Sequence, residues 1–334
     1  MITVENLHKT YGKTPALKGV SFTVNDGEIF GVIGPDGAGK TTLFRILASL
    51  LLPNGGYANM NGHDTAKAYK KIRRIIGYMP GRFSLYQDLS VEENLKFFAT
   101  VFNTTIEENY ELIKDIYQQI EPFKKRRAGA LSGGMKQKLA LSCALIHKPE
   151  ILILDEPTTG VDPVSRKEFW DMLAKLKQQG ITILVSTAYM DEASRCDRIA
   201  LMQNGQFIAT DTPQSIIDNY NETLWAVQTD RMSASLHDLR AHPRVTSCFA
   251  FGDVHHITVT NDLSREELTR YLSDKNYTHI EITPIKASVE DCFMALTNSE
   301  ALSQPPSKDE KYLSINTANN NTNHLPSRQI SHIP

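Results

Sequence analysis

The sequence predicts an α/β fold in which a mainly parallel sheet is flanked by helices. Apolar runs typical of buried strands alternate with segments of helical period, as from strand 151–154 to helix 163–179. A glycine-rich segment, 34–39, separates the apolar run 29–33 from the helical segment 43–51. This order of strand, glycine-rich loop and helix is typical of a site that binds phosphate groups.

The glycine-rich loop contains the residue types that phosphate binding requires. Its three glycines allow backbone N–H groups to crowd around a polyphosphate, the Lys40 ammonium can reach the outer phosphates, and the Thr41 hydroxyl can ligate Mg²⁺. A glycine-rich turn that binds nothing is the alternative, and the flanking strand and helix argue against it. The sequence therefore predicts a nucleotide phosphate site formed by Gly34, Pro35, Asp36, Gly37, Ala38, Gly39, Lys40, Thr41 and Thr42.

Two acidic residues follow the second apolar strand. Asp155 and Glu156 come directly after the run 151–154. We expect Asp155 to face Mg²⁺, directly or through water, and Glu156 to orient and deprotonate an attacking water. Two carboxylates at the end of a buried strand are costly without a cation nearby, so a purely structural pair is disfavoured.

A second anion site is predicted where another helix begins. Ser132 is placed to cap this helix, which runs to about Ile146. Gly133 and Gly134 expose backbone N–H groups at its N-terminus, where the helix dipole favours negative charge. Taken alone, this pattern is a weak signal.

Tyr11 lies ahead of the glycine-rich loop, in the turn between two strands of an expected antiparallel layer. Its ring can stack on a base or serve as a partly buried structural residue, and both interpretations remain open. Farther along, the segment of about 82–130 has a helical period, with Ser90 as an N-cap and Glu93 completing a capping box. This segment predicts an inserted helical subdomain.

Composition and charge limit the possible functions. The chain has 334 residues, enough for about two domains. Its net charge of −2 argues against a protein that coats nucleic acid, and the basic clusters 70–74 and 124–127 are interpreted as solvated faces. The four cysteines lie far apart without metal-type spacing, which fits a reducing cytosolic compartment. No apolar run approaches the ~20 residues that span a bilayer, so membrane association is expected through a partner.

The pattern changes after residue 222. Short strands and helices in the order βαββαβ predict a small split-βαβ domain over 223–298. A metal site at His242, His255 and His256 is disfavoured, because no Cys or acidic residue has matching spacing. The segment 299–334 is rich in Ser, Asn, Pro and Gln, which predicts a disordered tail.

Three motifs in this order carry a resemblance to a known family. The glycine-rich loop, Leu131-Ser132-Gly133-Gly134-Met135 and Leu154-Asp155-Glu156 resemble those of the nucleotide-binding subunit of an ATP-binding cassette (ABC) transporter, over about residues 1–222. More narrowly, the chain is similar to bacterial ABC-2 type, drug-exporter-like ATPases, and most to one half of exporters with two fused cassettes. The motifs that carry this narrower likeness are Gly34-Pro35-Asp36-Gly37-Ala38-Gly39, Gly77-Tyr78-Met79-Pro80, Leu85-Tyr86-Gln87-Asp88-Leu89, Gly160-Val161-Asp162-Pro163 and Tyr189-Met190-Asp191-Glu192-Ala193.

The resemblance implies ATP and Mg²⁺ as ligands. It assigns Tyr11 to stacking on adenine, Asp155 to the metal and Glu156 to catalysis, and gives Ser132 with Gly134 to the nucleotide of an opposite subunit. The implied partners are a second ABC ATPase subunit, identical or different, and an integral-membrane ABC-2 type permease, with no nucleic acid. The implied location is cytoplasmic, peripheral on the inner face of the cell membrane through the permease.

Two departures from the family pattern concern catalysis. The chain keeps Glu156 and Lys40, but it has Gly81 where the family carries a Gln and Ala188 where the family carries a His. Neither side chain can donate a hydrogen bond, so we expect this site to bind ATP and hydrolyse it poorly, while the intact Leu-Ser-Gly-Gly completes a partner's site. Two alternatives are a non-hydrolytic ATP-binding scaffold and a soluble ABC protein acting on ribosomes or DNA. The single cassette argues against the second of these.

Overall fold

The computed structural model describes residues 1–303, and their side chains up to residue 298. Its central feature is a six-stranded sheet with the strand order β10-β9-β3-β8-β7-β6. All neighbouring strands are parallel except β10, which pairs antiparallel with β9. The strands are β3 (Ile29–Ile33), β6 (Ile76–Met79), β7 (Ile151–Asp155), β8 (Thr182–Thr187), β9 (Arg198–Gln203) and β10 (Gln206–Asp211). The predicted mainly parallel sheet is confirmed.

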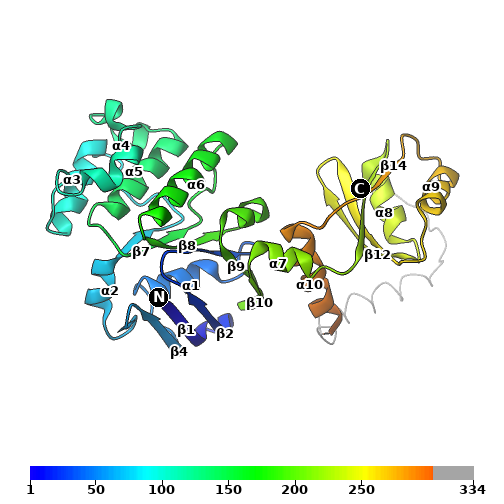
Figure 1. Ribbon diagram of the computed structural model, residues 1–334, viewed down its shortest axis with the longest axis horizontal. Helices are drawn as coiled ribbons and strands as arrows, with labels where there is room; N and C mark the ends of the chain where they lie inside the picture. The colour runs from blue at the N-terminus through cyan, green and yellow to red at the C-terminus, as the bar shows by residue number, and fades with distance from the viewer. Residues whose placement is uncertain (304–334) are drawn as a thin grey trace, which may run out of the picture. The chain divides into compact units, whose positions relative to one another are not determined.

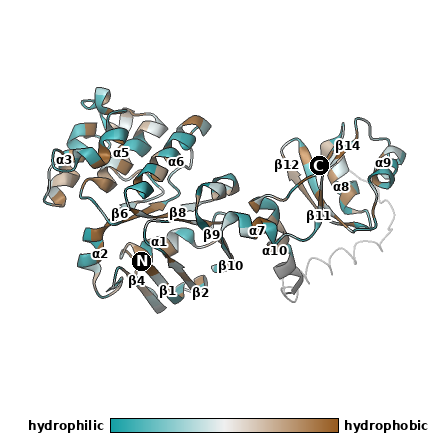
Figure 2. Cartoon of the chain, in the orientation of Figure 1, coloured by the Kyte–Doolittle hydropathy of each residue, from teal (hydrophilic) through white to brown (hydrophobic). Residues whose placement is uncertain are grey.

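The apolar runs of the sequence form the innermost strands. Every residue of β3, β7 and β8 is buried, as expected for parallel strands covered on both faces. Figure 1 shows helices on both sides of this sheet, and Figure 2 shows hydrophobic residues along its strands. Because these three strands are parallel, their carboxyl ends lie at the same edge of the sheet.

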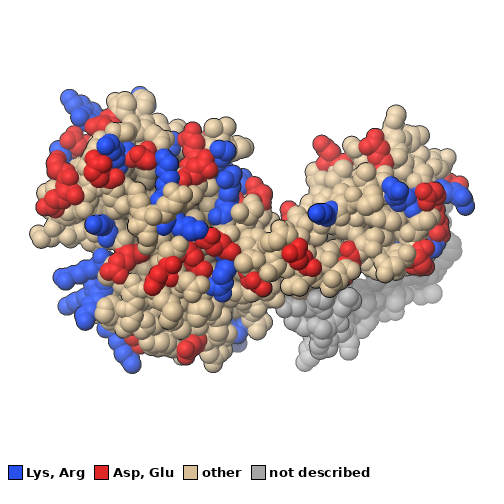
Figure 3. Space-filling view, in the orientation of Figure 1, with Lys and Arg blue, Asp and Glu red and all other residues tan. Residues whose placement is uncertain are grey.

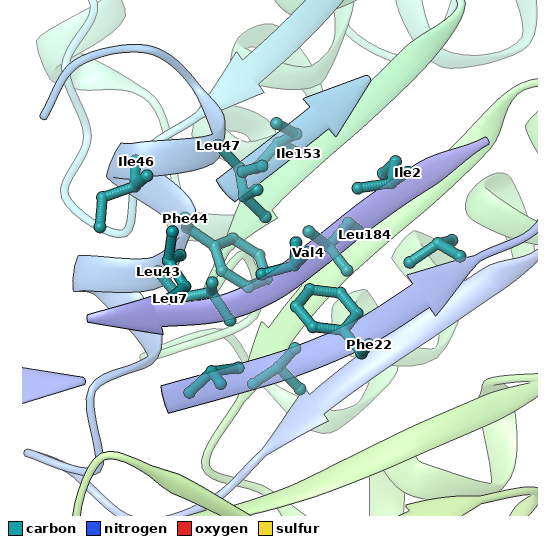
Figure 4. Packing of buried hydrophobic residues seen from close by; sticks show 14 of the residues in the cluster. Ile2, Val4, Leu7, Phe22, Leu43, Phe44, Ile46, Leu47, Ile153 and Leu184 are labelled. Carbon is teal, nitrogen blue, oxygen red and sulfur yellow. The ribbon is translucent and has the colours of Figure 1, made fainter. Parts of the chain in front are cut away.

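An antiparallel sheet with the order β2-β1-β4-β5 packs on the first helix. Its strands are β1 (Ile2–Tyr11), β2 (Thr14–Val24), β4 (Gly55–Met60) and β5 (His63–Asp64). The core between the layers contains Phe22, Phe44 and Leu184, which Figure 4 shows at close range. β1 continues to Tyr11, beyond the expected end of the strand, because its pairing with β2 extends to Tyr11 and Thr14.

The expected helical subdomain consists of two helices and two 3₁₀ turns, α3 (Val91–Val101), α4 (Tyr110–Tyr117), η1 (Glu121–Phe123) and η2 (Ala128–Ala130). The predicted capping box is confirmed, because Ser90 and Glu93 exchange side-chain and backbone hydrogen bonds. The other helices of this region are α1 (Lys40–Leu47), α2 (Tyr69–Ile75), α5 (Gly133–Leu145), α6 (Pro163–Gln178), η3 (Met190–Arg195) and α7 (Pro213–Asp218).

The last part has the expected βαββαβ order in an antiparallel sheet, β12-β13-β11-β14. Its elements are β11 (Thr223–Gln228), α8 (Met232–Arg240), β12 (Val245–Phe251), β13 (Val254–Val259), α9 (Arg265–Asp274) and β14 (Glu281–Pro284), followed by α10 (Val289–Ser303). Most of the predicted tail, 299–334, lies outside the described residues. None of the described helices is long and apolar enough to cross a membrane.

Candidate functional site

The glycine-rich loop joins β3 to α1 and takes a shape that other residues cannot adopt. Gly39 precedes α1 with a φ of 112°, in the left-handed region that favours glycine. A Cβ on Gly34 would lie 2.1 Å from the carbonyl oxygen of Met202, and one on Gly39 would lie 2.5 Å from that of Ala16. No side chain caps the first turn of α1. Its N–H groups can therefore serve an anion.

Lys40 is held rigidly at the start of α1. Only 3% of its side chain is exposed, and its Nζ donates to the carbonyl oxygens of Gly34 at 2.7 Å and Pro35 at 3.0 Å. The same Nζ lies 3.0 Å from Oε1 of Glu156, at the end of β7. The predicted phosphate-binding cation and the predicted base thus form an ion pair.

The carboxylate of Asp155 is buried beside two hydroxyl groups. Its Oδ1 accepts hydrogen bonds from Ser186 Oγ at 2.8 Å and Thr41 Oγ1 at 3.2 Å. Burial raises the pKa of Asp155, although the hydrogen bonds from Ser186 and Thr41 oppose this effect. Carboxylate and hydroxyl oxygens are the ligands that Mg²⁺ prefers. Asp155 and Thr41 therefore fit a magnesium ion that takes its remaining ligands from phosphate and water.

Glu156 leaves the strand abruptly. Its φ of 49° is positive, which is uncommon for a residue with a side chain and is found at functional sites. Its N–H lies 3.1 Å from the carbonyl oxygen and 3.0 Å from the hydroxyl of Ser186, so β8 fixes the turn. The partly exposed carboxylate of Glu156 points to Lys40.

Gly81 and Ala188 border this group. A Cβ on Gly81 would lie 3.0 Å from the carbonyl oxygen of Asp155 and 3.7 Å from Cβ of Glu156. Ala188 is half-buried and follows Thr187, whose carbonyl oxygen accepts a hydrogen bond from Gly34 N at 3.2 Å. The two positions that differ from the family pattern thus lie beside the paired acids and the phosphate loop, respectively.

A buried network next to the site was not predicted from the sequence. Glu192 Oε2 accepts hydrogen bonds from Thr187 Oγ1 at 2.6 Å and Thr158 Oγ1 at 3.1 Å, while its Oε1 lies 3.2 Å from Nε of Arg166. Thr158 is two residues past Glu156, and Thr187 directly precedes Ala188. Glu192 therefore connects the segment after the predicted base to the end of β8.

Tyr11 and Ser132 lie apart from this group. The Tyr11 side chain is 47% exposed at the end of β1, so stacking on a base and a partly buried structural role both remain open. Ser132 caps α5, accepting from Met135 N at 3.4 Å, and is exposed together with Gly133. In the described chain, no hydrogen bond joins Tyr11 or Ser132 to Lys40.

The three histidines considered as metal ligands, His242, His255 and His256, each have a different hydrogen-bond partner. His255 Nε2 lies 2.7 Å from the carbonyl oxygen of Met232, and His256 Nδ1 lies 2.7 Å from Oδ1 of Asp291. His242 Nδ1 accepts from the N–H of Arg244. Among the described residues, no group of three or more His, Cys, Asp and Glu side chains is arranged to hold a metal ion.

The fold and the site together define a class of protein. A strand leads into a glycine-rich loop whose lysine is held at the start of a helix. A second strand, separated from the first by β8, ends in an acid that is hydrogen-bonded to the residue after this lysine. These features are those of a P-loop nucleotide-binding protein.

Comparisons with known proteins narrow this class. Residues 17–159 match the family model described as ABC transporter. The chain is 33% identical over 310 residues to Nod factor export ATP-binding protein I of Burkholderia lata, covering 90% of this chain and 97% of that protein. The chain belongs to the family of ABC transporter ATP-binding proteins.

Two further proteins are similar over about two thirds of the chain. The probable multidrug ABC transporter ATP-binding protein YbhF of Escherichia coli is 42% identical over 220 residues, which are 65% of this chain and 38% of YbhF. The chain thus spans well under half the length of that relative. A solved dimer of the ATP-binding cassette MJ0796 with ADP and Pi is 28% identical, with a TM-score of 0.58, and the match covers 64% of this chain and 98% of that chain.

Proposed function

We propose that this chain binds Mg·ATP and couples its binding and hydrolysis to export by a separate membrane permease. The observation that carries the proposal is the junction of the phosphate loop with the paired acids, where Lys40 contacts Glu156 and Thr41 contacts Asp155. Relatives named for Nod factor export and multidrug transport support the direction of transport. The location follows from the permease, on the cytoplasmic face of the membrane.

Each residue of this junction has a part in the proposed reaction. Lys40 and the N–H groups at the start of α1 offset the charge of the outer phosphates. Thr41 and Asp155 would hold Mg²⁺, which neutralises charge on the phosphates when bound. Glu156 orients a water and takes its proton, because its carboxylate already faces the phosphate-binding cation.

We propose that this site is weakened and acts beside a second cassette. Gly81 and Ala188 border the acids and the loop without offering a side-chain donor to phosphate or water. The exposed Ser132 and Gly133, with Gly134, lie at the N-terminus of α5 and can complete the nucleotide site of a partner. The same two departures favour the second candidate, an ATP-binding scaffold that does not hydrolyse.

A cavity close to the paired acids is our candidate for the surface on which the permease docks. An apolar cavity of about 330 Å³ lies between the parallel sheet and the helical subdomain. Met79 and Pro80 line it, and the next residue is Gly81, which borders Asp155 and Glu156. We propose that a short cytosolic helix of an ABC-2 type permease fills this cavity. A movement of this permease helix would then be transmitted to Asp155 and Glu156 through residues 79–81.

We also propose the division into an ATP-binding domain, 1–222, and a small accessory domain, 223–298. The two regions have separate hydrophobic cores. The core of the second is formed by residues of the βαββαβ sheet and its helices, among them Val227, Leu239 and Leu268.

One set of measurements tests the function. The chain should bind Mg·ATP alone, and mixing it with a neighbouring cassette and permease should give ATPase activity that depends on all three. Ser132→Arg should leave ATP binding by the monomer intact and abolish ATPase in the mixed dimer, because a bulky cation blocks the anion site at α5. ATPase that is independent of Ser132 would refute the shared site. Stimulation by ribosomes or DNA instead of the permease would refute the transport function.

A further inference from the structure

The helix α2 concentrates positive charge on one part of the surface. A chain of net charge −2 places five cations within eight consecutive positions. All five side chains are exposed, and Figure 3 shows Lys and Arg gathered where α2 lies. We call this the α2 basic face, and its cations are Lys67, Lys70, Lys71, Arg73 and Arg74.

These charges are almost uncompensated. Lys67 lies 3.9 Å from Asp64, whereas in the described chain no carboxylate lies within 4.0 Å of the other four cations. Arg73 instead donates to the carbonyl oxygen of Ser49 at 2.8 Å and to its hydroxyl at 3.1 Å. An anion brought to this face would therefore meet a local field that no neighbouring acid cancels.

The second basic cluster of the chain, 124–127, has a different environment. It faces acids at the start of α3, where Ser90 and Lys96 lower the pKa of Glu93 and Glu92, respectively, and nearby cations of the cluster lower these pKa values further. The cluster thus has acids nearby, although in the described chain no carboxylate lies within 4.0 Å of its cations. This cluster serves as a matched control for the α2 basic face.

Exposed apolar side chains lie beside the cations of α2. Leu50 is 54% exposed and Tyr69 is 43% exposed, and Leu52, two residues after Leu50, is 64% exposed. Arg73 lies close to both Leu50 and Tyr69. It donates a hydrogen bond to the carbonyl oxygen of Ser49, the residue before Leu50, and its guanidinium lies 5.4 Å from the centre of the Tyr69 ring. Cations mixed with exposed leucine and tyrosine suit the interface of a bilayer, where apolar groups enter the headgroup region and cations meet phosphates.

The position of the face agrees with this chemistry. Leu50 and Arg73 line the same cavity that we assign to the permease helix, so the α2 basic face is continuous with the surface that would face the membrane subunit. We propose that the α2 basic face binds the anionic phospholipids of the bilayer around the permease. The proposal rests on the proposed function for its location, whereas its charge and exposure are independent of that function.

Vesicle flotation with the full chain tests the proposal. The chain should float with vesicles containing about a third phosphatidylglycerol, should not float with phosphatidylcholine alone, and should dissociate as salt is raised. Each cation near an anionic surface strengthens partitioning by roughly fivefold, so replacing Lys70, Lys71 and Arg74 together by Gln should weaken it by about a hundredfold. The control replaces Lys124, Lys125 and Arg127 by Gln and should retain binding. Leu52→Ser should weaken binding without changing its salt dependence.

Three outcomes would overturn the proposal. One is equal binding to both kinds of vesicle, and another is an equal loss in the control variant. The third is a triple α2 variant that still floats but no longer co-purifies with the permease in detergent, which would make the face a protein contact. ATP binding by each variant checks that the variant is folded. The vesicle assay requires neither nucleotide nor permease, so its result does not depend on the proposed function.

Discussion

Replacing Ala188 by His should supply a catalytic contact that alanine cannot make. Position 188 follows the residue whose carbonyl oxygen bonds to Gly34 N, so its side chain begins beside the phosphate loop. A His there can donate a hydrogen bond to the transferring phosphoryl group, which alanine cannot do. We expect Ala188→His to raise the ATPase rate of the chain by at least about tenfold.

The magnitude follows from the cost of losing a preorganised donor. Such a loss typically lowers the rate by about 10²–10³, and a loop shaped around alanine recovers only part of that factor. Gly81→Gln should add little, because its Cβ would lie 3.0 Å from the carbonyl oxygen of Asp155 and would press on the turn that carries Glu156. The double variant should therefore resemble Ala188→His alone.

Single-turnover hydrolysis with saturating ATP, on protein free of partners, measures this effect. Ala188→Leu adds a side chain without a donor and serves as the control. The reasoning is wrong if the leucine variant gains as much as the histidine variant. It is equally wrong if the unmodified chain already hydrolyses ATP at a rate that His does not improve.

Three other variants follow from the site. Lys40→Ala should weaken ATP binding by at least about tenfold in calorimetry, and unchanged affinity would refute its role. Asp155→Asn should melt higher than the unmodified protein at neutral pH without Mg²⁺. Because the folded pKa of Asp155 is raised above 3.8, chiefly by burial, the charged form costs stability as pH rises through that pKa. The advantage of Asn should vanish toward pH 3.8, and a pH-independent difference would contradict this. Glu192→Ala should lower the free energy of unfolding in urea by about 2–4 kcal/mol, because Thr158, Thr187 and Arg166 lose a buried partner. The exposed neighbour changed in Asp191→Ala should cost under about 1 kcal/mol, and equal costs would refute the network.

The sequence predicts the parts of the site that are continuous in the chain. The loop around Lys40 and the acids after β7 are local patterns of glycine, charge and apolar runs, and the structure brings them together. The roles of Ser186 and Glu192 depend instead on β8 lying between β3 and β7. Ser186 lies 30 residues from Glu156, and Glu192 lies 34 residues from Thr158, so these partners are identified by the order of the strands. The serine directly after the apolar part of β8 is the one available signal.

The sequence also did not predict two backbone conformations, those of Glu156 and Asn103. The positive φ of Glu156 results from anchoring of its N–H by Ser186, 30 residues away, rather than from local preference. The helical period of the subdomain was recognised, but its division into α3 and α4 was not. Asn103, which lies between them, has a φ of 57°. Asparagine tolerates this left-handed conformation but also occurs in other conformations, so its presence did not predict the break.

The ion pair between Lys40 and Glu156 gives the protein an internal competitor for its own substrate. A carboxylate 3.0 Å from Lys40 Nζ satisfies the charge that a phosphate would otherwise meet alone, so each binding event replaces one anion by another. Breaking the contact between Lys40 and Glu156 therefore lowers the observed affinity for nucleotide. Glu156→Gln should consequently bind ATP more tightly as a monomer, and an unchanged dissociation constant would show that no such exchange occurs. The residue that we propose as the catalytic base would then also set how much ATP must be present before the site fills.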